Sequence, residues 1–117
     1  MSKLQKFTAD QWQSQVMRTV KPVLVDFRAP WCQPGILKNR MLEKVAVDLG
    51  EGVNVGFIDI VQSVDLAVYC RAHDLPALTL LFNGKILITY SGPNRIEKMM
   101  TRWMSLAVPM VSWIPIR

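Results

Sequence analysis

Residues 22–27, PVLVDF, form a short apolar run that is interrupted only by Asp26. A run of this length and β-branched character, bounded by Pro22 and Pro30, is typical of a strand buried on both faces of a sheet. Such a strand requires helices on both sides of its sheet, and helical patterns occur before and after it. We therefore expect an α/β domain with this segment as its central strand.

Local sequence motifs mark where the other helices and strands begin and end. Thr8 with Gln11 three residues later is a capping-box pattern that begins a helix, and Asn83-Gly84 between two apolar runs is a strong hairpin signal. The expected elements are a short strand at 3–7, a helix from 8 to about 20, strands at 22–27 and 53–60, helices at 33–49 and from 63 to about 73, strands at 77–82 and 85–90, and an amphipathic helix after 93.

The composition supports one folded unit. The chain has 117 residues, of which 50% are hydrophobic and 20% charged, so it can fill the core of a single domain. We expect this domain to span residues 1–107. Residues 108–117 then form an apolar C-terminal extension that either docks on its own domain or contacts a partner or a second copy.

Charge and hydropathy limit the partners. The net charge is +5, but Lys and Arg are scattered without a dense basic run, which disfavours a nucleic-acid surface. No apolar stretch approaches the ~20 residues of a membrane span, and no secretory signal is visible. The expected compartment is the cytoplasm, which would keep Cys32 and Cys70 as thiols.

The element order, with the stretches VLVDFRAPWCQPG and HDLPALTLLFNGK, resembles the thioredoxin family up to about Leu106. The residues that carry the resemblance are Asp26, Phe27, Trp31, Cys32, Pro34, Pro76, Asn83-Gly84 and Gly92. The resemblance implies the thioredoxin fold, a mixed central sheet with helices on both faces, and a cis-proline at Pro76. It also implies thiol–disulfide chemistry with protein thiols or disulfides and no bound cofactor.

The chain departs from the family pattern around the site. Gly35 stands where the family has its second, resolving cysteine. The other departures are Gln33 for a glycine, Arg28 for an aromatic residue, Arg40 for a proline and Phe57 for a lysine that many members carry. The site therefore holds one thiol, and the ordinary dithiol cycle is not expected.

Cys32 is the candidate nucleophile. It precedes the second helical pattern, and a helix N-terminus stabilises a thiolate, the attacking form of the thiol. A mixed disulfide at Cys32 would need an external thiol such as glutathione for release. Cys70 is the less favoured resolving group, because a disulfide requires Cα atoms within ~7 Å. The alternative is that Cys32 is inert.

The other candidate site residues follow from the resemblance. Trp31, Pro34, Leu75 and Pro76 are expected to form the substrate groove, with the backbone of Leu75 pairing with an extended peptide. Asp26 is a costly anion inside an apolar strand, and with Phe57 no lysine offsets its charge. For Asp26 a proton relay and a structural remnant both stay open.

Two functions of different classes compete. The first is a single-cysteine thioredoxin-like protein, a thiol–disulfide oxidoreductase without the dithiol motif, and the second is a non-catalytic protein-binding module. A metal or cluster held by Cys32 from two chains is a weaker third reading. Two cysteines and His73 are too few for a four-ligand zinc site, so we expect no metal.

Overall fold

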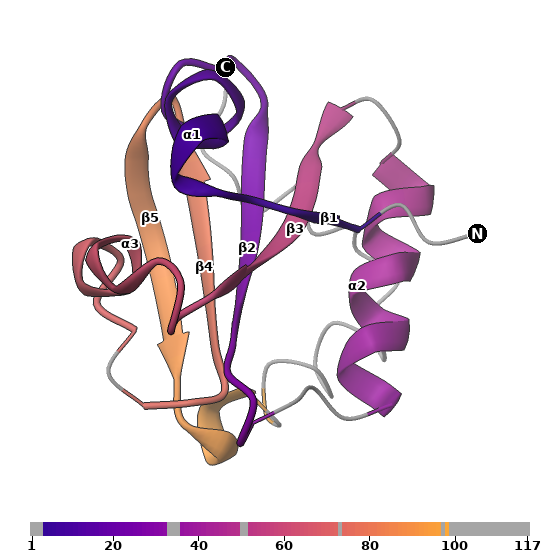
Figure 1. Cartoon of the computed structure of the whole chain (residues 1–117). Coiled ribbons are helices and arrows are strands. Elements are labelled where there is room, and N and C mark those ends of the chain that lie inside the picture. Colours follow the sequence, from indigo (N-terminus) through magenta and orange to yellow (C-terminus); the bar gives the residue numbers. More distant parts are fainter. Residues whose placement is uncertain (1–3, 33–35, 50–51, 73, 97, 99–117) are drawn as a thin grey trace.

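The computed structural model describes residues 4–32, 36–49, 52–72, 74–96 and 98 (Figure 1). They form a five-stranded sheet with α2 on one face and α1 and α3 on the other. The elements are β1 (Gln5–Lys6), α1 (Ala9–Trp12), the π-helical turn η1 (Gln13–Met17), β2 (Pro22–Arg28), α2 (Ile36–Leu49), β3 (Asn54–Asp59), α3 (Val64–Tyr69), β4 (Ala77–Phe82) and β5 (Lys85–Ser91). Residues 93–96 are again helical. The expected α/β class and mixed central sheet are confirmed.

The sheet has the strand order β1-β3-β2-β4-β5. β2 pairs in parallel with β3 and antiparallel with β4, while β1 runs parallel to β3 and β5 antiparallel to β4. β2 therefore occupies the centre of the sheet, as its uninterrupted apolar run predicts.

Side chains of β2 alternate between two cores, one on each face of the sheet. Val23, Val25 and Phe27 pack in the core on the α1 and α3 face, whereas Leu24 packs in the core that contains residues of α2. Asp26 is two positions after Leu24, so it lies on the α2 face, and it is fully buried. The carboxylate thus lies under the helix that follows Cys32 in the chain.

The turn at Asn83-Gly84 confirms the predicted hairpin. Both residues have positive φ, 54° and 77°, which matches a two-residue turn of the type that Asn-Gly favours. The strands on either side pair from Phe82 with Lys85 to Ala77 with Ser91. This hairpin forms one side of the sheet next to β2.

Two helices are shorter than their patterns predict. The first ends at Met17 rather than near Val20, because the chain turns there, with the N–H of Arg18 donating to the carbonyl of Gln13. The third ends at Tyr69 rather than near residue 73, because Arg71 has φ of 61°, a left-handed conformation that stops a helix. The predicted start of the second helix at residue 33 lies outside the described residues.

Gly56 lies where β3 meets the N-terminal segment. A Cβ at this position would be 2.3 Å from the carbonyl oxygen of Gln5 and 2.7 Å from the ring of Phe7. We expect Gly56→Ala to lower the free energy of unfolding by about 1–3 kcal/mol through overpacking. Urea denaturation would measure the loss, with Gly52→Ala as control because a Cβ there meets nothing within 4 Å. Equal midpoints for the two variants would contradict the prediction.

Candidate functional site

Cys32 lies in the connection between β2 and α2. Its N–H donates to the carbonyl of Ala29 at 3.0 Å, and the N–H of Ala29 donates back at 3.4 Å, which closes a tight turn after the central strand. Cys32 is half-buried and not in a disulfide. Gln33, Pro34 and Gly35 lie outside the described residues, so the predicted groove residue Pro34 has no described position. Cys32 therefore lies just beyond the C-terminal end of the central strand, with part of the residue exposed to solvent.

The loop with Leu75 and Pro76 lies at the same end of the sheet as Cys32, because β4 begins beside the end of β2. Ala77 at the start of β4 pairs with Phe27 near the end of β2. The Leu75–Pro76 peptide bond is cis, and the carbonyl of Pro76 accepts the N–H of Gly92 at 2.9 Å. On the other side of Leu75, the backbone of Asp74 exchanges hydrogen bonds with the hydroxyl of Ser91, at 3.2 and 2.9 Å. The loop is thus fastened to the end of β5 on both sides of Leu75.

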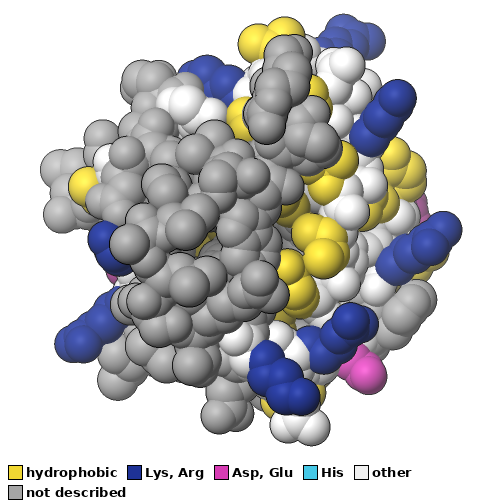
Figure 2. Space-filling view, turned by 180° about the vertical axis from the view of Figure 1, so that it is seen from behind, with side chains coloured by type: hydrophobic (Ala, Val, Ile, Leu, Met, Phe, Trp, Pro, Cys, Tyr) yellow, Lys and Arg dark blue, Asp and Glu magenta, His cyan; other side chains and the backbone are white. Residues whose placement is uncertain are grey.

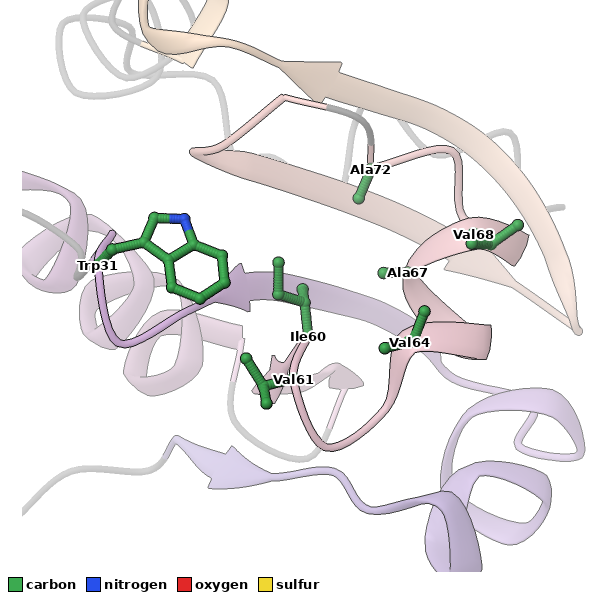
Figure 3. A pocket seen from close by; sticks show the side chains of 7 residues that line it. All are labelled: Trp31, Ile60, Val61, Val64, Ala67, Val68 and Ala72. Atoms are coloured by element: carbon green, nitrogen blue, oxygen red, sulfur yellow. The ribbon is translucent and has the colours of Figure 1, made fainter.

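Trp31 forms one wall of an apolar pocket that the sequence prediction did not fully anticipate. The pocket has a volume of about 470 Å³, and Figure 3 shows Trp31 opposite residues from α3 and from the two segments next to it. The lining residues are Trp31, Ile60, Val61, Val64, Ala67, Val68 and Ala72. Leu75 and Pro76 are half-buried and do not line this pocket.

Most of the pocket wall is exposed to solvent. Trp31 is 72% exposed, Val61 54%, Val64 57% and Val68 71%. The valines at 61, 64 and 68 follow helical spacing, a pattern that is usually read as a core face. The sequence feature that could have identified them is Leu66-Ala67. These two residues already supply the contacts of α3 with the core, which leaves Val64 and Val68 on the solvent side of the helix.

Asp26 has two cationic partners, which corrects the expectation that nothing offsets its charge. Arg28 Nε donates to Asp26 Oδ2 at 2.8 Å, and the ammonium of Lys38, from α2, pairs with Oδ1. Lys38 is itself 3% exposed. Position 57 supplies no cation, and Arg28 and Lys38 provide the compensating charges instead. Nothing in the family pattern indicated that these two residues lie next to Asp26.

Phe57 and Arg28 are also in contact. The guanidinium of Arg28 stacks 4.2 Å from the centre of the Phe57 ring, a cation–π arrangement, and its Nη2 donates to Asn39 Oδ1 at 3.0 Å. Arg28 thus contacts its own strand, β3 and α2. These two departures from the family pattern form one local structure.

Cys70 is in the core on the α1 and α3 face and is fully buried. Burial raises the pKa of the Cys70 thiol from 9.0 to about 12, so it is not a ready thiolate at neutral pH. We expect Cys70 to react with iodoacetamide only as fast as the protein unfolds. Intact-protein mass spectrometry of Cys32→Ser, with and without urea, would measure this. Rapid labelling of the native variant would contradict the burial.

The raised pKa of Cys70 also predicts a pH dependence of stability. The unfolded chain releases this proton near pH 9, whereas the folded chain keeps it until about pH 12. The contribution of Cys70 to stability is therefore complete below pH 9 and is lost as the pH rises from there toward 12. Urea midpoints for the unmodified protein and Cys70→Ala should diverge less at high pH than at pH 8. A constant difference would contradict the prediction.

The remaining predictions concern partners and ligands. Within the described ranges, no group of three or more His, Cys, Asp or Glu residues is placed to hold a metal ion. No helix in the described part of the chain is long and apolar enough to cross a membrane. On the face in Figure 2, Lys and Arg side chains appear at separate places. His73 and the extension at 108–117 lie outside the described residues.

Comparison with known proteins places these features in a family context. Residues 3–105 match the family model described as Thioredoxin. The chain is 28% identical to a thioredoxin-like protein of Synechocystis, covering 76% of this chain and 82% of the relative, and 29% identical to a thioredoxin of Buchnera aphidicola, covering 79% and 85%. The crystal structure of thioredoxin from Malassezia sympodialis has a TM-score of 0.67, with 24% identity, and covers 87% of this chain and 91% of that one.

Proposed function

Because this chain belongs to the thioredoxin family, we propose that it exchanges disulfides through the single thiol of Cys32. Family membership supports thiol–disulfide chemistry in general. The one-cysteine route is supported chiefly by the different burial of the two cysteines. Cys32 is half-buried beyond the end of β2, whereas Cys70 is fully buried. Cys32 is therefore the thiol that a protein substrate can reach.

The exchange takes place in two balanced steps. The Cys32 thiolate attacks one sulfur of a substrate disulfide, which forms a mixed disulfide and releases the other substrate sulfur as a thiolate. An external thiolate then attacks the substrate sulfur of the mixed disulfide, which forms a new disulfide and regenerates the Cys32 thiolate. Glutathione, abundant in a reducing cytoplasm, has the chemistry that the second step requires. No second cysteine of this chain takes part.

The pocket beside Trp31 supports a substrate with an apolar segment next to its reactive sulfur. Trp31 precedes Cys32 directly, and the lining side chains in the described part of the chain carry no charge. An extended segment bonded to Cys32 could therefore bury aliphatic side chains against Val61, Val64 and Val68. We propose a protein disulfide flanked by branched aliphatic residues as the preferred substrate.

Mass spectrometry of the intact protein tests the exchange. The reduced Cys70→Ala variant, incubated with oxidised glutathione at neutral pH, should gain one glutathione adduct and lose it when reduced glutathione is added. Cys32→Ser is the matched control and should gain no adduct in its native state. A Cys70→Ala protein that remains unmodified while its denatured form is modified would overturn the proposed chemistry.

One observation favours the second candidate, a non-catalytic binding module. The exposed pocket could hold a partner without any bond to sulfur, because its lining residues supply apolar area of their own. Binding of an apolar peptide that contains no cysteine, with equal affinity for the unmodified protein and Cys32→Ser, would support this function. Loss of binding on Cys32→Ser would reject it.

A further inference from the structure

The interior on the α2 face contains three charged groups in direct contact. The side chain of Asp26 is 0% exposed, that of Lys38 4% and that of Arg28 16%. Arg28 Nε donates to Oδ2 of the carboxylate at 2.8 Å, while the ammonium of Lys38 pairs with Oδ1. One buried anion is therefore shared by two cations.

The contacts join two elements of the fold. Asp26 and Arg28 belong to β2, whereas Lys38 and Asn39 belong to the first turn of α2 in the described residues. Lys38 bonds to Asp26, and Asn39 accepts from Arg28 at 3.0 Å, so successive residues of the helix are each tied to the strand. Cys32 lies in the connection between these two ends.

Beside Asp26 in the sheet, the structure places two apolar residues. Its neighbours in register are Phe57 on β3 and Leu78 on β4, both without an ionisable group. Among the described residues, Oδ1 receives no hydrogen bond beyond its ion pair with Lys38. Each carboxylate oxygen of Asp26 thus faces a cation, Arg28 at Oδ2 and Lys38 at Oδ1, so both oxygens are already engaged.

We propose that Asp26 is the fixed counter-ion of a clamp with Arg28 and Lys38, and that it carries no proton for Cys32. The clamp holds the start of α2 against the end of β2, so Arg28 and Lys38 act as positioning residues for the segment that contains Cys32. This inference does not depend on the proposed exchange reaction, because the clamp has its own stability signature.

Thermal denaturation distinguishes the clamp from an uncompensated buried acid, because Asp26→Asn would shift the melting temperature in opposite directions in the two cases. Asp26→Asn should lower the melting temperature by about 10 °C or more, because two cations lose their buried counter-ion. For an acid that nothing compensates, the same substitution would remove a costly charge and raise the melting temperature. An unchanged or raised melting temperature would therefore overturn the clamp.

A charge-matched double variant is the control. Asp26→Asn with Lys38→Met removes one anion and one cation, so the net charge of the cluster stays as in the unmodified protein. We expect it to recover at least half of the loss in melting temperature caused by Asp26→Asn alone. Losses that simply add would show that Asp26 and Lys38 are not coupled, and would overturn the proposal.

Two further readouts address the proton. Carbon NMR of the unmodified protein at pH 7 should show the Asp26 carboxyl in its ionised form. If Cys32 reacts with oxidised glutathione, the pH profile of the rate should keep its shape in the double variant and change only in height. A protonated Asp26, or a pH inflection that disappears with the double substitution, would restore the proton-relay function. The melting and NMR results stand even when Cys32 does not react.

Discussion

Replacing Phe27 by alanine is expected to lower the free energy of unfolding by about 3–5 kcal/mol. Phe27 is 1% exposed and lies on the central strand between Ile58 of β3 and Ala77 of β4. Its ring belongs to the core on the α1 and α3 face, so we expect truncation to leave a cavity there. Since a domain is typically stable by about 5–15 kcal/mol, this variant approaches the limit of folding.

Urea denaturation monitored by circular dichroism would measure the loss. Val20→Ala is the matched control, because Val20 is 80% exposed and should change stability by no more than about 0.5 kcal/mol. Phe27→Leu should fall between the two, since it keeps much of the buried volume. A loss below about 1 kcal/mol for Phe27→Ala would show that the site collapses around the smaller side chain.

The second large effect is expected at the apolar pocket. Val64→Ser with Val68→Ser should slow disulfide exchange with an apolar peptide by up to about 100-fold at low peptide concentration. Full burial of each valine is worth about 1.5 kcal/mol, or roughly tenfold in affinity. Both side chains are more than half exposed, 57% and 71%, so the fold should not depend on them.

The comparison that isolates the pocket uses two substrates. Exchange with oxidised glutathione, which has no apolar flank, should be unchanged in the double valine variant. Val20→Ser, an exposed valine outside the pocket, should leave the rates with both substrates unchanged. Equal slowing with glutathione and peptide would point to a disturbed Cys32 rather than a lost binding surface.

The fold was predictable because its strongest signals are local. The apolar run of β2 specifies a central strand whatever surrounds it, and Asn83-Gly84 specifies a tight hairpin through backbone conformation alone. The end of α3 was less predictable, because it depends on Arg71 adopting a left-handed conformation that its residue type does not favour. The local pattern of apolar residues therefore did not indicate where α3 ends.

The candidate site was predictable only in part. Trp31 and Cys32 adjoin in sequence and remain together in the structure, whereas the partners of Asp26 come from position 28 and, across the connection, from position 38. A buried lysine in the helix pattern of α2 does not by itself indicate a carboxylate beneath it. The pocket was missed for a related reason, since a valine row at helical spacing is the same pattern whether it faces the core or the solvent.

The strand order has a consequence for the way the molecule opens. β1 contributes two paired residues at the outside of the sheet, whereas β2 is held along six pairs on each side. Amide hydrogens of β1 should therefore exchange with solvent deuterium first and those of β2 last. Cys32 follows the strand that opens last, so local fluctuations that release the N-terminal edge leave the base of the reactive loop in place.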